Sequence, residues 1–219
     1  MSAEPIDVID LGEGKRPDFV ETVPKFFIEI GTADFDTYAG LAKQGWKGIF
    51  VEPVKKLLDN IERFDGCIYE NTAITKESIH TKVMYYDPAW AKGWVRGVGT
   101  LDMDMNTMNS NPEWKEHERH SYIVTMTLDD LIEKHGVQKI DMLKIDTEGT
   151  EFEILDSYSW KIKPNTIKFE YEHWLNRSIP VEKYIKMLEG MGYNCVKDEH
   201  DGVAILKCAK QPLNGSHLS

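Results

Sequence analysis

The chain has 219 residues, and 26 Lys and Arg against 37 Asp and Glu give it a net charge of −11. Hydrophobic residues make up 41% of the sequence, which excludes bulk disorder and is typical of one globular domain. The negative charge argues against a protein that binds nucleic acid through its phosphates. Three cysteines, Cys67, Cys195 and Cys208, have no close spacing, so we expect structural thiols rather than a disulfide framework or a zinc knuckle.

The first thirty residues contain no basic start followed by an apolar stretch, so we expect a cytoplasmic protein without integral membrane association. We predict an N-terminal extension over residues 1–24, a single domain over 25–210 and a polar tail over 211–219. Residues 89–120 show no helical or strand periodicity. A long irregular insertion of this kind is typical of a substrate lid.

From Lys25 onward, short apolar runs alternate with amphipathic segments, which predicts βα units around a mostly parallel sheet. The expected strands cover residues 26–30, 48–52, 67–70, 81–86, 121–126, 140–145 and 167–172, and a terminal hairpin pairs 193–196 with 203–206. The expected helices lie between residues 34 and 45, from Pro53, over 127–136, from Glu148 and over 180–189. Thr127 and Asp130, three positions apart, resemble a capping box at the start of the third of these helices.

Ligands of open α/β sheets bind beyond the carboxyl ends of the strands, so polar residues that follow strands are candidate site residues. Gly31 follows the first strand and allows a sharp turn in which a ligand can approach backbone amides. Glu52 ends the second strand 21 residues later, a spacing that suits a carboxylate bound to ribose hydroxyls. A plain turn and a helix N-terminal charge are the alternative interpretations of these two residues.

Two further strand ends carry polar residues. Asn71 can support an adenine or a ribose beside an apolar wall of Ala73 and Ile74, or it can make a local turn. Asp146 and Glu148 place two like charges at a strand end, which a cationic ligand or a helix N-terminus would offset. Two caps on one helix are the alternative here.

Together these segments resemble the FkbM-type S-adenosylmethionine-dependent methyltransferases, over residues 25–207. The most specific match is the run KIDTEGTE at 144–151, which is close to the family's K-I-D-x-E-G-x-E. The other matching segments are Phe27–Thr32, Val51–Pro53, Asn71–Ala73 and Thr127–Leu131. One departure is the missing second glycine of the family's first motif, where this chain has Phe35 or Asp36.

The resemblance implies the α/β fold class, with a Rossmann-like seven-stranded sheet that is mostly parallel, an antiparallel C-terminal hairpin and helices on both faces. It implies S-adenosylmethionine as cofactor and O-methylation of a sugar, a glycan or a small-molecule metabolite. The cofactor-binding residues that it implies are Glu29, Gly31, Thr32, Ala33, Asp34, Glu52, Pro53, Asn71, Thr72, Ala73, Asp146 and Glu148. A nicotinamide-dependent oxidoreductase, which would need a richer glycine turn, and a catalytically inactive Rossmann-type binding domain are the alternatives.

Methyl transfer to a hydroxyl can require a base, and the candidates are Asp146 and His173, whose imidazole titrates near neutrality. A packed or surface histidine is the alternative for His173. Residues 116–120 contain two histidines that could hold a metal if helical, but a solvated charge run is favoured and we predict no metal site. The three tryptophans of residues 89–120 form an apolar wall for an acceptor or pack in the core or lid.

Overall fold

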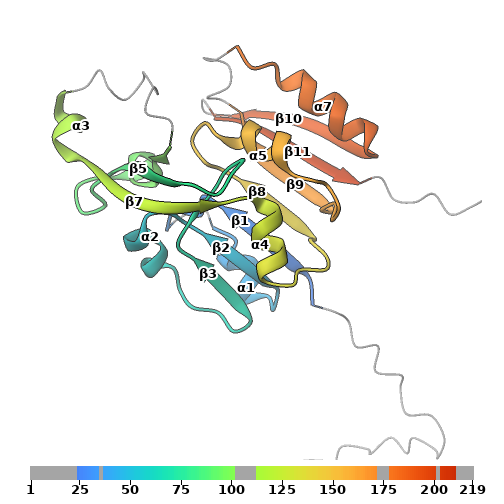
Figure 1. Ribbon diagram of the computed structural model, residues 1–219, viewed down its shortest axis with the longest axis horizontal. Coiled ribbons are helices and arrows are strands. Elements are labelled where there is room, and N and C mark those ends of the chain that lie inside the picture. Colours follow the sequence, from blue (N-terminus) through green and yellow to red (C-terminus); the bar gives the residue numbers. More distant parts are fainter. Residues whose placement is uncertain (1–23, 35–36, 102–111, 172–177, 201–202, 211–219) are drawn as a thin grey trace, which may run out of the picture.

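The computed structural model describes residues 24–34, 37–101, 112–171, 178–200 and 203–210 (Figure 1). One set of strands consists of β1 (Phe26–Ile30), β2 (Lys47–Val51), β3 (Cys67–Glu70), β8 (Met142–Ile145), β9 (Thr166–Glu170), β10 (Tyr193–His200) and β11 (Val203–Lys210). A second set consists of β4 (Ala73–Ile74), β5 (His80–Tyr86), β6 (Gly99–Thr100) and β7 (Glu118–Met126). The helices are α1 (Ala39–Lys43), α2 (Lys55–Asn60), the 3₁₀-helix η1 (Gly93–Gly97), α3 (Pro112–His117), α4 (Leu128–Lys134), α5 (Glu151–Ser157) and α7 (Val181–Gly190).

The first set of strands forms a seven-stranded sheet in the order β10-β11-β9-β8-β1-β2-β3. The five strands from β9 to β3 are parallel, whereas β11 runs antiparallel to both β9 and β10. This arrangement confirms the predicted α/β fold with its antiparallel C-terminal hairpin. The second set forms a separate four-stranded sheet in the order β4-β7-β5-β6, which the sequence did not distinguish from the main sheet.

Helices cover both faces of the main sheet, because the side chains of each strand alternate between two hydrophobic clusters. Ile28 and Ile30 of β1 belong to the larger cluster, which includes buried residues of α4, α5 and α7. Phe27, the residue before Ile28, faces the opposite side and packs against Phe50 of β2 with ring centroids 5.0 Å apart. Residues of α1 and α2 complete that second cluster, so the prediction of helices on both faces is confirmed.

Residues 89–120 contain more regular structure than the sequence predicts. They include η1, β6 and α3, and β7 begins at Glu118 rather than at residue 121. Trp90 and Trp114 pack around Tyr86 of β5 in a small separate cluster. Each of the first three elements has six residues or fewer, too short to produce a recognisable periodicity. Residues 116–120 divide between α3 and β7, so they do not form the single helix that a metal site there would need.

The C-terminal hairpin has eight residues in each strand rather than the four predicted. Its antiparallel register places Cys195 directly opposite Cys208, and the two form a disulfide. The prediction of structural thiols is therefore wrong for these two residues, while Cys67 is free. The cysteines are 13 residues apart in sequence, and only the pairing of the two strands brings them into contact.

Two predicted helix starts are too early. Helix α2 begins at Lys55, so Pro53 precedes its first turn. Helix α5 begins at Glu151, and Glu148 lies before it with a positive φ of 56°.

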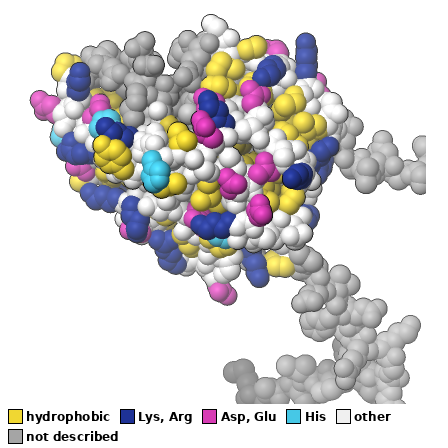
Figure 2. Space-filling view, in the orientation of Figure 1, with side chains coloured by type: hydrophobic (Ala, Val, Ile, Leu, Met, Phe, Trp, Pro, Cys, Tyr) yellow, Lys and Arg dark blue, Asp and Glu magenta, His cyan; other side chains and the backbone are white. Residues whose placement is uncertain are grey.

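Within the described residues, no helix is long and apolar enough to cross a bilayer. The face shown in Figure 2 mixes acidic, basic and apolar side chains rather than presenting one sign of charge.

The predicted capping box at the start of α4 is present and supports a testable expectation. Thr127 Oγ1 accepts a hydrogen bond from the Asp130 amide at 3.1 Å, and the Asp130 carboxylate accepts one from the Thr127 amide at 3.2 Å. We expect Thr127→Ala to lower the free energy of unfolding by about 1 kcal/mol, as measured by urea denaturation. Thr127→Ser keeps the hydroxyl and should retain most of that stability; an equal loss in both variants would contradict the assignment.

Candidate functional site

The glycine turn after β1 is held between the ends of two neighbouring strands. The amides of Gly31 and Thr32 both donate to the carbonyl of Val51, at 2.9 and 3.2 Å. Gly31 has a φ of +75°, and a Cβ added there would lie 1.7 Å from the carbonyl oxygen of Asp146. No other residue fits without moving the backbone, so glycine here is required by both conformation and close approach.

This turn forms one wall of a cavity at the carboxyl ends of β1, β2 and β8, which we call the sheet-edge cavity. Its empty volume is about 410 Å³, which includes space open to solvent. The predicted site residues that line it are Gly31, Glu52, Pro53, Thr72, Ala73 and Asp146. Its other lining residues are Ile30, Val51, Ile74, Val83, Gly97, Gly99, Leu101, Thr147 and Thr150.

Glu52 is the buried acid of the sheet-edge cavity, with 3% of its surface exposed. Its two carboxylate oxygens accept hydrogen bonds from the amides of Ala33 and Val54, each at 2.8 Å. Burial raises the pKa of Glu52 to about 7, and the nearby acids Asp34 and Asp146 add to the rise while the two amides oppose it. The carboxylate therefore joins the glycine turn to the start of α2 and still faces the cavity.

Glu29 lies behind the glycine turn rather than in the cavity lining, and it is fully buried. Its carboxylate accepts hydrogen bonds from Thr32 Oγ1 at 3.1 Å and from the Tyr38 amide at 2.8 Å. Lys144 Nζ lies 3.3 Å from Glu29 Oε1 and 3.5 Å from Asp146 Oδ2. Burial raises the pKa of Glu29, and the Lys144 charge partly offsets this. Glu29 thus supports the turn from inside the fold.

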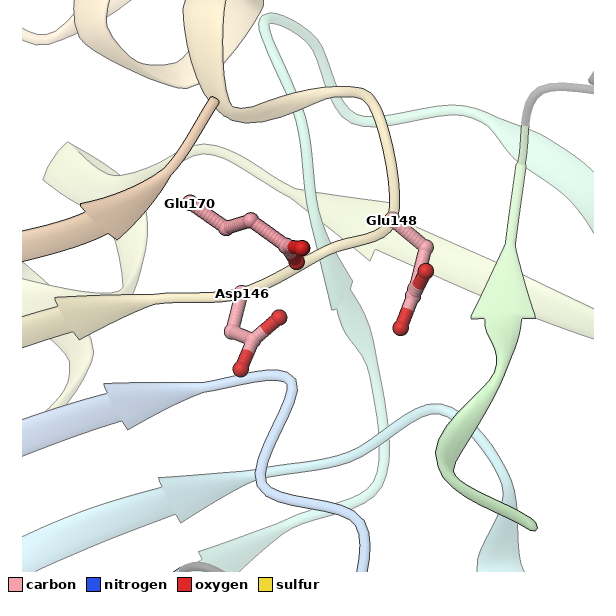
Figure 3. Close-up of side chains that lie close together, drawn as sticks. All are labelled: Asp146, Glu148 and Glu170. Atoms are coloured by element: carbon pink, nitrogen blue, oxygen red, sulfur yellow. The ribbon is translucent and has the colours of Figure 1, made fainter. Parts of the chain in front are cut away.

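Three carboxylates converge beside the cavity, from Asp146, Glu148 and Glu170 (Figure 3). One oxygen from each lies within 4.8 Å of the others, close enough for all three to bind one divalent cation. Burial raises the pKa of Glu170, and the neighbouring charges of Asp146 and Glu148 raise it further. The sequence-based prediction of no metal site stays a prediction, since carboxylates can also cluster without an ion.

The 3₁₀-helix η1 contacts the residues that follow Gly31 and contributes Gly97 to the cavity lining. Arg96 Nη2 forms an ion pair with the Asp34 carboxylate, which also accepts a hydrogen bond from Asn60 Nδ2 at 2.9 Å. Thr100 Oγ1 donates to the carbonyl of Glu148 at 2.9 Å. The described part of residues 89–120 is therefore attached to both the β1 and the β8 sides of the cavity.

The remaining predicted site residues have mainly structural contacts. Asn71 Nδ2 donates to the carbonyls of Glu52 and Pro53, each at 2.9 Å, and so holds the turn after β2. Thr72 Oγ1 donates to the carbonyl of Val124 at 2.6 Å, which links the cavity wall to β7. His173, the second predicted base, lies outside the described residues.

In a comparison with protein families, the family described as the methyltransferase FkbM domain matches residues 27–195. The chain belongs to the FkbM methyltransferase family. None of the curated proteins matches this sequence. The matched range includes the glycine turn, Glu52 and the three converging carboxylates, and membership of this family implies a methyl donor.

The sequence analysis did not identify four residues of this candidate site: Glu170, Lys144, Glu151 and Arg96. Glu170 ends β9, but the predicted strand ran to residue 172, so the strand-end rule did not identify it. Lys144 and Glu151 lie inside the KIDTEGTE run; Glu151 Oε1 accepts a hydrogen bond from the Thr147 amide at 2.7 Å. No local sequence pattern marked Arg96 as a site residue, because only folding brings its segment to the glycine turn.

The raised pKa of Glu52 predicts a specific pH dependence of stability. The folded state holds the Glu52 proton up to about pH 7, whereas the unfolded chain releases it near pH 4.5. The free energy of unfolding therefore falls as the pH rises between these values, by at most about 3 kcal/mol for this residue. We expect Glu52→Gln to lose less stability than the wild type between pH 5 and pH 8, measured by urea denaturation.

The control is Glu62→Gln, which removes a carboxylate whose side chain is 62% exposed. This variant should show the wild-type pH dependence. If Glu52→Gln lost as much stability as the wild type over the same pH range, the titration would have to be assigned to another group.

Proposed function

We propose that this protein is an S-adenosylmethionine-dependent methyltransferase that methylates a hydroxyl oxygen of a sugar, a glycan or a small-molecule metabolite. The observation that carries the proposal is the shared position of the Gly31 turn and the buried Glu52 carboxylate on one cavity, at the carboxyl ends of adjacent parallel strands. An adenosine cofactor needs both features, a turn without side chains and an acceptor for the ribose diol.

The cavity residues fit such a cofactor. Each oxygen of Glu52 accepts one backbone hydrogen bond and keeps further acceptor capacity for a hydroxyl donor. Val51, Ile74 and Val83 supply apolar walls suited to an adenine ring. Among the described residues, the lining contains carboxylates and no basic side chain, which favours a ligand that carries positive charge.

Bound S-adenosylmethionine would supply an electrophilic methyl group on a sulfonium. The protein would then have to orient the acceptor, exclude water and accept the proton of its hydroxyl. Asp146 is our proposed base, because it lines the cavity and its side chain is 31% exposed, with the Lys144 ammonium 3.5 Å from its carboxylate. His173 remains the second candidate.

Titration calorimetry tests the proposal directly. We expect the purified protein to bind S-adenosylmethionine and S-adenosylhomocysteine but not NAD. Glu52→Ala should weaken both complexes by 10-fold or more, since a hydrogen bond to a charged group contributes about 1.5–3 kcal/mol.

Glu62→Ala, which removes the exposed carboxylate, should bind both compounds like the wild type. The thermal unfolding of Glu52→Ala has to be recorded first, because this variant also loses two backbone hydrogen bonds. Binding of NAD instead would favour an oxidoreductase, and a folded protein that binds none of the three compounds would favour an inactive binding domain.

A further inference from the structure

Arg96 of η1 has donor capacity that the described residues do not use. Its Nη2 pairs with the Asp34 carboxylate, but its Nε is buried and has no hydrogen-bond partner among the described residues. A guanidinium has five N–H donors, and a buried donor without a partner costs about 1–3 kcal/mol. The side chain as a whole is 35% exposed, so an anion beside it can bind guanidinium donors that Asp34 does not use.

The position of Arg96 connects it to the sheet-edge cavity. Gly97, the next residue, lines the cavity. Asp34, its ion-pair partner, follows Ala33, whose amide donates to the cavity-lining carboxylate of Glu52. Arg96 therefore lies where η1 and the glycine turn meet at the cavity.

Arg96 is also the cation best placed to bind an anion there. The charged residues in the cavity lining are the acids Glu52 and Asp146. Lys144, the buried cation next to them, is 3% exposed and already lies within 3.5 Å of the carboxylates of Glu29 and Asp146. Arg96 has 35% of its side chain exposed and one carboxylate partner among the described residues.

We propose that Arg96 binds the α-carboxylate of the methyl donor, with Asp34 as the positioning residue that orients the guanidinium. The inference rests on the proposed function, since S-adenosylmethionine carries one carboxylate beside two positive groups. The acids of the site suit the positive groups, and the guanidinium suits the carboxylate through charge-assisted hydrogen bonds. Asp34, predicted from sequence to contact the cofactor, would then act on it through Arg96.

The test compares S-adenosylmethionine with decarboxylated S-adenosylmethionine, which lacks only this carboxylate, by titration calorimetry on the full chain. We expect the wild type to bind S-adenosylmethionine more tightly, by about 10- to 100-fold. Arg96→Gln should weaken binding of S-adenosylmethionine by a similar factor and leave binding of the decarboxylated compound within about threefold, so the preference disappears.

Lys92→Gln is the matched control, because it removes an exposed cation from the same segment and should keep the preference. If Arg96→Gln lost the same factor of affinity for both compounds, Arg96 would only hold η1 in place, and the inference would be overturned. A wild type without a preference would also overturn it while leaving the proposed function intact. A wild type that binds neither compound would refute the proposed function itself, and the inference with it.

Discussion

The site depends on the contact between Gly31 and the backbone of Asp146. The glycine turn approaches that carbonyl so closely that a Cβ at residue 31 would lie 1.7 Å from its oxygen. The Asp146 amide donates to the Ile30 carbonyl at 3.0 Å, and the Gly31 amide donates to Val51 at 2.9 Å. These bonds align the ends of β2, β1 and β8, so the acids that follow the strands reach one cavity.

The same alignment brings several carboxyl groups together in the buried part of the fold. Glu29, Glu52 and Glu170 all have raised pKa values, with burial as the largest cause. Lys144 offsets part of this charge from within the sheet, where it lies near both Glu29 and Asp146. Buried carboxylates reduce stability at neutral pH, and binding of the positively charged methyl donor proposed above would give a physical reason for retaining them.

Much of the fold could be predicted because its signals are local. The alternation of apolar runs located the strands of the main sheet, and the capping box at Thr127 marked the start of α4. The disulfide between Cys195 and Cys208 could not be predicted, since strand register determines it. The sequence analysis missed η1, β6 and α3 within residues 89–120, because these elements are short and are stabilised by packing such as that of Trp114 on Tyr86.

The sequence by itself determined the mostly parallel α/β fold class through its periodicity, and the FkbM family resemblance through motifs such as KIDTEGTE. Six of the twelve cofactor-binding residues that this resemblance implies line the cavity. The tertiary structure decided which side of the cavity wall each polar residue occupies. Glu29 and Asn71 support the turns, whereas Glu52 and Asp146 face the cavity. It also brought Arg96 to Asp34 across 62 residues of sequence, a contact that has no local pattern because only the packing of η1 against the glycine turn creates it.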